Sequence, residues 1–414
     1  MFKNYFTSVW RYISHNKAFT AINISGLAIG MTACMLIAQF VLHEFSYDTF
    51  HANKDRIFRL QLDRYNKGEI STRWASGAAG IGPDVKANFP EVKYYVRMTN
   101  RNSVFSYGDV FFKEDFAYFA SDDFFRVFSY KLLKGIDSLV LKDPFKIVIS
   151  QSFAKKYFGE EDPIGKIVRN NGDKDYEVTG VYEDMPANSH MKADALMSFI
   201  SLNKMWNDPI TSWNWDGFLT YILLDKKSDP KAFEAKLPAF VQKKMGPEMK
   251  NDNANMIFNL QAVNDIHLDS DFIGEFKPNG NRQSVYFLSI VAILIIIIAW
   301  INYINLSTAK SIERAREVGV RKVMGGFRTQ LIQQFLLESV LLNILAVAIA
   351  IIAVLLLTPW FNKLTGREQD YFLFRQQLFW IWIAVLIIGG ALLSGIYPAF
   401  VLSAYKPVDV MKGR

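Results

Sequence analysis

The stretch VYFLSIVAILIIIIAWINYINL, from Val285 to Leu306, decides the fold class of this sequence. It contains no charged residue. As a helix that rises about 1.5 Å per residue it would cover roughly 30 to 35 Å, which is the thickness of the hydrocarbon core of a bilayer. A buried helix of a water-soluble protein rarely contains so long an apolar run, so the sequence predicts a membrane-spanning helix here.

Three further stretches are long and apolar enough to cross a bilayer, namely residues 19–41, 335–357 and 378–397. Residues 44–284, between the first two of the four predicted spans, have the composition of an ordinary soluble domain. The predicted fold class is therefore an α-helical membrane protein with four transmembrane helices and a large α+β extracytoplasmic domain between helices 1 and 2.

The first span has two alternative interpretations. A cleaved signal peptide fits poorly, because the apolar run is about twice as long as a normal h-region and no polar cleavage stretch follows it. The sequence M-T-A-C at Met31–Cys34 imitates a lipoprotein cleavage box, but the apolar run continues beyond Cys34 where a lipidated protein should become polar. We therefore expect an uncleaved span.

Composition excludes several classes of protein. The chain has 414 residues, of which 50% are hydrophobic, with 24 Gly and 13 Pro, so a disordered or collagen-like protein is excluded. A single cysteine, Cys34, rules out an intramolecular disulfide framework and a cysteine-rich zinc site. The formal net charge of +7 would suggest nucleic acid as a partner, but the basic surplus lies beside the predicted spans and no DNA-reading motif is present.

The basic residues beside the spans predict the orientation of the chain. Lys and Arg are concentrated in residues 1–18, 307–334 and 398–414, which must lie on one side of a four-span protein and, by the positive-inside rule, in the cytoplasm. Residues 1–18 also have apolar positions at helical spacing and are expected to lie along the lipid interface as an amphipathic helix. The predicted location is the bacterial inner membrane, with both termini cytoplasmic and residues 44–284 periplasmic.

The segment 44–284 shows no catalytic or metal-binding motif. Gly159–Lys166 has the wrong glycine spacing for a phosphate loop. The three histidines of the segment, at positions 51, 190 and 267, have no metal-ligand spacing with one another or with His43 just before it. Strand-like and helix-like runs alternate along it. We expect strands at 57–62, 93–98, 146–150 and 176–181, and helices at 151–158 and 231–244.

Residues 309–324, between the second and third spans, predict a short amphipathic helix that ends at Gly325. Glu317 precedes Arg321 by four residues, which is the favourable order for an ion pair on a helix. Physical chemistry leaves two functions open for this helix. It is either an interfacial helix that turns its basic side to anionic lipid or a docking helix for a cytoplasmic partner.

Several motifs resemble the FtsX-like/MacB class of ABC transporter permeases, with a MacB-like periplasmic core domain. The most specific is R-A-R-E-V-G-V-R-K-V-M-G-G at Arg314–Gly326. The others are NKAFTAINISGLAIG at Asn16–Gly30, SQSFAKKYFGEEDPIGK at Ser150–Lys166, FLLES at Phe335–Ser339, GIYPAF at Gly395–Phe400 and KPVDVMKG at Lys406–Gly413. The resemblance covers nearly the whole chain, although Asn203–Met256 contributes nothing recognisable to it.

The resemblance implies that the segment 307–334 docks on a cytoplasmic ABC ATPase. The docking residues it implies are Arg314, Arg316, Glu317, Gly319, Val320, Arg321, Lys322 and Gly325. Glu338, an acid at the membrane entrance of the third span, is costly in lipid and is expected to pair with a basic residue of this segment. The chain contains no Walker A sequence, so it is expected to be a non-catalytic subunit without a cofactor of its own, with ATP and magnesium on the partner ATPase.

The resemblance further implies a second permease subunit, either a copy of this chain or a related one. Gly26 and Gly30 form a G-x-x-x-G motif in the first span, which would allow close helix packing either between two subunits or within one. A periplasmic adaptor and an outer-membrane channel are further expected partners, besides membrane lipid and without nucleic acid. Some relatives join two such four-span halves, so this chain is either a natural half or a piece.

The expected function is that of a permease subunit that transmits ATP-driven motion to its periplasmic domain for export or extrusion of a substrate such as an antimicrobial or a lipoprotein. The alternative is a mechanotransmitting regulator or sensor that controls a cell-envelope hydrolase without transport. The spans lack a row of charged residues that would suggest an ion path, which favours mechanical transmission over a pore.

Overall fold

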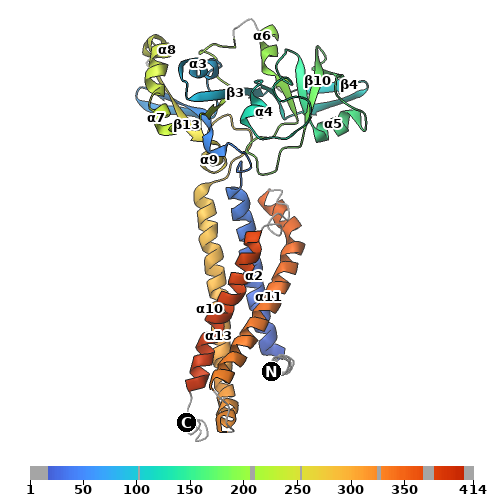
Figure 1. Ribbon diagram of the computed structural model, residues 1–414. Helices are drawn as coiled ribbons and strands as arrows, with labels where there is room; N and C mark the ends of the chain where they lie inside the picture. Colours follow the sequence, from blue (N-terminus) through green and yellow to red (C-terminus); the bar gives the residue numbers. More distant parts are fainter. Residues whose placement is uncertain are drawn as a thin grey trace. The chain divides into compact units, whose positions relative to one another are not determined.

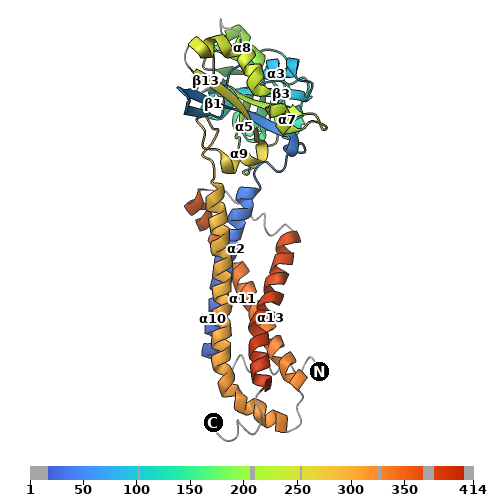
Figure 2. The ribbon, with the colours of Figure 1, turned by 90° about the vertical axis from the view of Figure 1, so that its left-hand side faces the viewer.

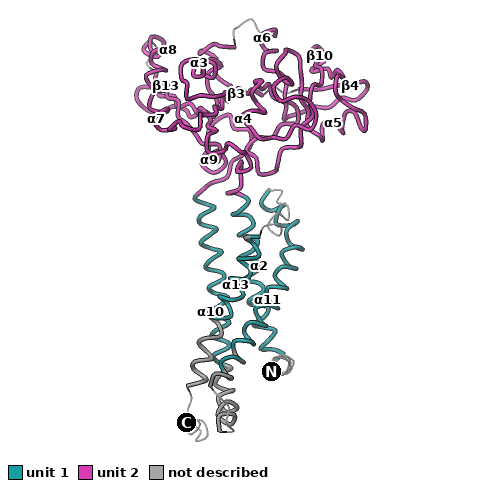
Figure 3. Tube along the Cα trace, viewed as in Figure 1, with its two compact units in different colours: residues 1–43, 283–414 teal, residues 44–282 magenta. Residues whose placement is uncertain are grey.

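The computed structural model describes residues 17–100, 103–205, 210–251, 254–323, 328–366 and 377–404, and it describes their side chains except at positions 251, 254, 310–331, 334, 335, 378 and 393–404. The chain divides into two compact units (Figure 3). The helical unit comprises Met1–His43 and Gln283–Arg414, and the sheet unit comprises Glu44–Arg282. The predicted boundaries of the extracytoplasmic domain were 44 and 284.

The sheet unit is built on one mixed, mainly antiparallel sheet of 13 strands in the described residues. The order of the strands is β13-β1-β12-β3-β6-β11-β8-β10-β9-β4-β5, and β2 and β7 pair with β1 and β10. Only two of the pairings, β10 with β8 and β11 with β6, are parallel. The strands are β1 (Ile57–Asn66), β2 (Glu69–Trp74), β3 (Val92–Asn100), β4 (Ser103–Tyr107), β5 (Val110–Glu114), β6 (Ala117–Ala120), β7 (Leu132–Lys134), β8 (Lys146–Ser150), β9 (Ile167–Asn170), β10 (Lys174–Tyr182), β11 (Ala195–Ser198), β12 (Leu219–Leu224) and β13 (Ala254–Ala262).

Short helices cover the sheet and divide its core into clusters. The helices are α3 (Ile81–Asn88), α4 (Phe124–Val127), α5 (Gln151–Phe158), α6 (Leu202–Met205), α7 (Pro230–Glu234), α8 (Leu237–Asn251) and α9 (Val263–Asp269), with 3₁₀ turns at Lys54–Arg56 and Phe199–Ser201. Helices α3, α7 and α8 bury Val85, Phe233 and Val241 against β1 and β12, whereas α5 buries Phe153 and Tyr157 against the other end of the sheet. Figure 1 shows these two groups of helices as separate clusters.

The sequence predicted some of these elements. All four expected strands are found, and the helix expected at 151–158 is α5, whose first turn is capped by the Ser150 hydroxyl accepting from the amide of Phe153 at 3.1 Å. The turn that joins β9 to β10 contains Asn171 and Gly172, with φ angles of 52° and 77°. The single helix expected at 231–244 is instead divided into α7 and α8. Helix α7 begins at Pro230 and is capped by Asp229. It ends after Glu234, before α8 begins at Leu237.

The helical unit consists of α2 (Lys17–Phe45), α10 (Arg282–Val323), α11 (Arg328–Thr365) and α13 (Gln377–Ala404), which Figure 2 shows from the side. Three of them contain stretches long and apolar enough to cross a membrane, at Lys17–Phe45, Arg282–Ala309 and Leu336–Thr365. In α13 the apolar stretch among described residues is Phe379–Leu392, which is shorter. The described residues therefore support three spans, and the fourth stays a prediction.

The short amphipathic helix expected at 309–324 is not separate, because the helical backbone of α10 continues from the second span to Val323. The physical reason is visible in the sequence. Between Arg282 and Val323 there is no proline, and Gly319 is the one glycine, so nothing interrupts the helix where the chain changes from apolar to basic.

The core of the helical unit joins all four helices. Leu27 and Met31 of α2 pack with Ala299 of α10, Ala346 of α11 and Ile383 of α13. The helices approach closely at Gly30, where an added Cβ would lie 2.7 Å from the Cβ of Ala299. Small residues of this kind permit the close backbone contacts on which helix packing in lipid depends.

Candidate functional site

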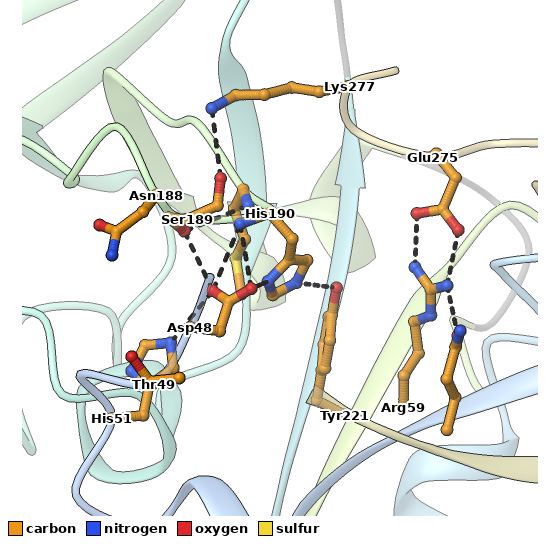
Figure 4. A network of polar contacts seen from close by, with 12 residues as sticks. Asp48, Thr49, His51, Arg59, Asn188, Ser189, His190, Tyr221, Glu275 and Lys277 are labelled. Carbon is orange, nitrogen blue, oxygen red and sulfur yellow. Dashed lines mark hydrogen bonds and ion pairs between the residues drawn. The ribbon is translucent and has the colours of Figure 1, made fainter. Parts of the chain in front are cut away.

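The densest cluster of polar side chains in the described residues lies around Asp48, which follows α2 directly (Figure 4). Its side chain is completely buried, and its φ angle of 57° places it in the left-handed region that residues other than glycine rarely adopt. Its amide donates to the carbonyl of Asn188 at 2.9 Å, and the amide of His190 donates back to its carboxylate at 3.2 Å. The chain leaving α2 is thus bound to the connection between β10 and β11.

Two histidines and a tyrosine extend this cluster. The Nδ1 atom of His190 lies 2.9 Å from Oδ2 of Asp48, and its Nε2 atom lies 2.9 Å from the hydroxyl of Tyr221 on β12. On the other side, Nε2 of His51 lies 3.7 Å from Oδ1 of Asp48, and its Nδ1 accepts from the amide of Ser129 at 3.1 Å. We call Asp48, His51, Ser189, His190 and Tyr221 the Asp48 cluster.

The charges of the Asp48 cluster shift the pKa values of its members. Burial opposes ionisation of Asp48, but attraction and hydrogen bonding by His190 and His51 outweigh it and lower the pKa of this carboxyl to about 2. Burial lowers the pKa of His51, although Asp48 opposes that effect. Burial also raises the pKa of Tyr221, which keeps its proton. Asp48 is therefore an anion at neutral pH.

A buried ion pair between Arg59 and Glu275 lies near the Asp48 cluster. Arg59 of β1 makes a two-pronged contact with Glu275, with its Nη1 and Nη2 atoms at 2.7 and 2.6 Å from the two carboxylate oxygens. The same Nη2 donates to Gln261 of β13 at 2.6 Å. Because Glu275 lies between α9 and α10, this pair binds the chain that leaves the sheet unit to β1, the second strand in the order of the sheet.

The geometry argues against catalysis by these residues. The side chains of Asp48, His51 and His190 are at most 1% exposed, so no substrate in the aqueous phase can reach the Asp–His–Tyr chain without local unfolding. Within the described part of the chain, no three His, Cys, Asp or Glu side chains are grouped so as to hold a metal ion. The arrangement instead ties together segments that are far apart in the sequence.

Sequence reasoning missed this cluster. It noted the histidines but found no ligand spacing among them, and 142 positions separate Asp48 from His190. The pairing depends on the path of the β10–β11 connection, which no local spacing reveals. The one local signal was an acid placed directly after an apolar span.

The expected docking residues are placed only in part. Arg314, Arg316, Glu317, Gly319, Val320, Arg321 and Lys322 all fall on the helical backbone of α10, but their side chains lie outside the described residues. Gly325 lies outside the described residues altogether. Their role in docking remains a prediction.

The remaining predicted positions lie inside the helical unit. Glu338 of α11 is buried, with 7% of its surface exposed, and the basic segment with which it is expected to pair lies among side chains that are not described. Its neighbour Ser339 lies 3.2 Å from the hydroxyl of Tyr303 on α10. Gly26 and Gly30 of α2 both face α10, against Asn302 and Ala299.

Relatives with curated descriptions cover large parts of this chain. It is 23% identical over 300 residues to the macrolide export ATP-binding/permease protein MacB of Vibrio parahaemolyticus. The alignment covers 70% of this chain and 41% of that protein. It is 27% identical over 201 residues to the uncharacterised ABC transporter permease YknZ of Bacillus subtilis, covering 48% of this chain and 45% of that one. The chain thus spans less than half the length of either relative.

Among solved structures, a crystallised domain of a protein described as a permease, from Porphyromonas gingivalis, aligns with a TM-score of 0.45 at 22% identity, covering 51% of this chain and 91% of that domain. Two family models match. Residues 20–240 match the MacB-like periplasmic core domain, and residues 289–407 match the FtsX-like permease C-terminal region. The first model alone covers more than half of the chain. This protein therefore belongs to the FtsX/MacB type of ABC transporter permease.

Proposed function

We propose that this chain is the membrane subunit of an ATP-driven assembly, in which a separate cytoplasmic ABC ATPase docks on residues 307–334 and its motion is carried to the sheet unit on the periplasmic side for export or extrusion of a substrate. Two copies of the chain, or this chain and a related one, form the membrane part. ATP and magnesium are bound by the partner.

One observation carries this proposal. Helix α10 runs without a break from Arg282, the last residue of the sheet unit, through the second span to Val323, 42 residues in all. The basic end and the sheet unit are thus joined by one hydrogen-bonded element, so a displacement at the basic end is expected to reach the sheet unit. The family membership supplies the ATPase class of the partner.

The scarcity of buried charged side chains in the described part of the helical unit supports the transmission of motion over conduction through a pore. In the described residues of the helical unit, Glu338 is the only buried acidic or basic side chain. A path for an ion or a charged solute would be expected to contain several such residues facing its interior. Export would then occur from the periplasmic side, by movement of the sheet unit.

The test is to isolate the tagged chain from its native membrane, identify the ATP-binding protein that co-purifies by mass spectrometry, and reconstitute both in liposomes. The double charge reversal R321E/K322E should abolish stimulation of ATP hydrolysis by the membrane subunit. The reversal K363E, on an exposed lysine near the other end of α11, is the matched control and should leave stimulation intact. Unchanged stimulation in R321E/K322E would refute the docking site, and absence of any ATPase would refute the assembly.

A further inference from the structure

Helix α9 lies where the two ends of the sheet unit meet. The leading segment, residues 44–48, follows the first span, and the trailing segment, residues 270–282, runs into α10. These segments are more than 220 positions apart in the sequence, yet both are bound to α9. We propose that α9 is a clasp that locks the leading and trailing segments into one rigid junction, so that the outer ends of the first and second spans are displaced together.

The leading segment is held by His267 of α9. Its Nε2 atom lies 2.8 Å from Oε2 of Glu44, and the two side chains are 2% and 1% exposed. The ring of Tyr47 stacks on the imidazole with 3.3 Å between the ring centres and 4° between the planes. A buried contact between a carboxylate and an imidazole, covered by a ring, has little freedom to reorganise, since either partner left alone would be a buried, unpaired polar group.

The trailing segment is held by the same histidine. The amide of Gly280 donates to the carbonyl of His267 at 2.8 Å. A Cβ added at Gly280 would lie 2.4 Å from Oε2 of Glu44 and 2.9 Å from Nε2 of His267. The backbone of the trailing segment therefore lies directly against the Glu44–His267 contact that holds the leading segment, and a side chain at position 280 would displace one of these two groups.

An arginine completes the clasp at the start of α10. The Nε atom of Arg282 donates to the carboxylate of Asp269 at 2.7 Å, and its Nη2 donates to Asp265 at 2.7 Å. Both acids belong to α9. The first residue of α10 is thus fastened to the helix that also holds the end of α2.

The Asp48 cluster forms a second tie between the same two segments. The connection between β10 and β11 binds the leading segment through Asp48 and through Asn188, whose Nδ2 donates to the carbonyl of Ser46 at 3.0 Å. The same connection binds the trailing segment, since Lys277 donates to the carbonyl of Ser189 at 3.3 Å (Figure 4). Two ties at different places oppose rotation of one segment about the other.

Hydrogen–deuterium exchange of the full chain in lipid nanodiscs tests the clasp without any partner or nucleotide, so its outcome is independent of the proposed function. The amides to follow are those of Asp48, bonded to Asn188, and of Gly280, bonded to His267. If the two segments open as one unit, both amides exchange at the same slow rate in the unaltered protein. The strands β3 and β12 serve as an internal reference for intact folding.

Two mild variants, one at each end, provide the decisive comparison. R282A should speed exchange about tenfold both at the trailing segment and at Asp48. E44Q should do the same at the leading segment and at Gly280. The reason is that a change at either end makes the shared opening of both segments easier. R169A, which removes an arginine from an exposed pair with Asp175, should change neither amide. Faster exchange confined to the substituted end, with the reference strands protected, would overturn the clasp.

Discussion

The two units differ in how far apart in the sequence their buried polar groups find partners. In the sheet unit these groups connect segments that are far apart, as Asp48 does with Ser189 across 141 positions and Glu44 with His267 across 223. In the helical unit several of them bond one turn back on their own helix. Thr32 donates to the carbonyl of Ala28, Asn343 to that of Ser339, and Thr358 to that of Val354.

This difference follows from the solvent that each unit is built for. In lipid there is no hydrophobic drive between helices, so close packing of small residues holds them together and polar side chains are satisfied locally. Helices held mainly in this way can tilt or slide with the loss of few buried bonds, such as that between Tyr303 and Ser339. The sheet unit, with cross-linking ion pairs in its interior, must instead move as a block. A protein that transmits motion needs both helices that can move and a domain that moves as a block.

The largest expected effect is in the Asp48 cluster. D48N keeps the shape and tolerates the positive φ angle, but it removes the charge that His190 and His51 face, and we expect a loss of about 2–4 kcal/mol in the free energy of unfolding of the sheet unit. Chemical denaturation of the full chain in nanodiscs, followed by near-ultraviolet circular dichroism, would measure it. D175N, in an exposed pair, should leave the stability nearly unchanged. Equal losses of stability in D48N and D175N would contradict the claim that the buried contacts of Asp48 stabilise the sheet unit more than an exposed pair does.

The next effect tests packing in the helical unit with two adjacent glycines of α13. A Cβ at Gly390 would lie 2.7 Å from Oδ1 of Asn343 and 2.9 Å from Nε1 of Trp300, whereas a Cβ at Gly389 meets nothing within 4 Å. G390A should therefore lower stability in mild detergent by about 1–3 kcal/mol. G389A should be neutral or stabilising by up to about 1 kcal/mol, because alanine favours helix. Thermal unfolding of both variants makes the comparison, and identical behaviour would mean that this contact does not hold α13.

Acidification provides the smallest effect. The pKa of His51 is lowered below its ordinary 6.5 in the folded protein, so the unfolded chain binds protons more readily and stability falls as the pH drops below 6.5 through the folded value. The pKa of Asp48, lowered from 3.8 to about 2, adds stability above 3.8 that is lost as the pH falls towards 2. The melting temperature of the sheet unit against pH should thus fall in two steps. H51Q should remove the upper step and D48N the lower, and a profile unaltered by both would contradict these assignments.

Much of the fold was accessible from the sequence because the decisive patterns are local. The apolar runs predicted the spans, and the strand-like and helix-like runs predicted four strands and α5. The division at Ala235 was missed. The continuity of α10 was also missed, although the absence of proline between Arg282 and Val323 permits it. The buried ties could not be predicted, because Glu44, His267 and Gly280 meet only when the sheet has brought both ends of the unit together.

The central claim is that the basic end of α10 is the docking surface for an ABC ATPase. Its most direct test is a photo-activatable cross-linking residue at Val320, with the same residue at Lys363 as the matched control, in cells that contain the native partners. The account predicts a cross-link from position 320 to an ABC-type ATPase and none from position 363. Cross-links from 320 only to lipid or to envelope proteins, or equal capture of the ATPase from both positions, would contradict it.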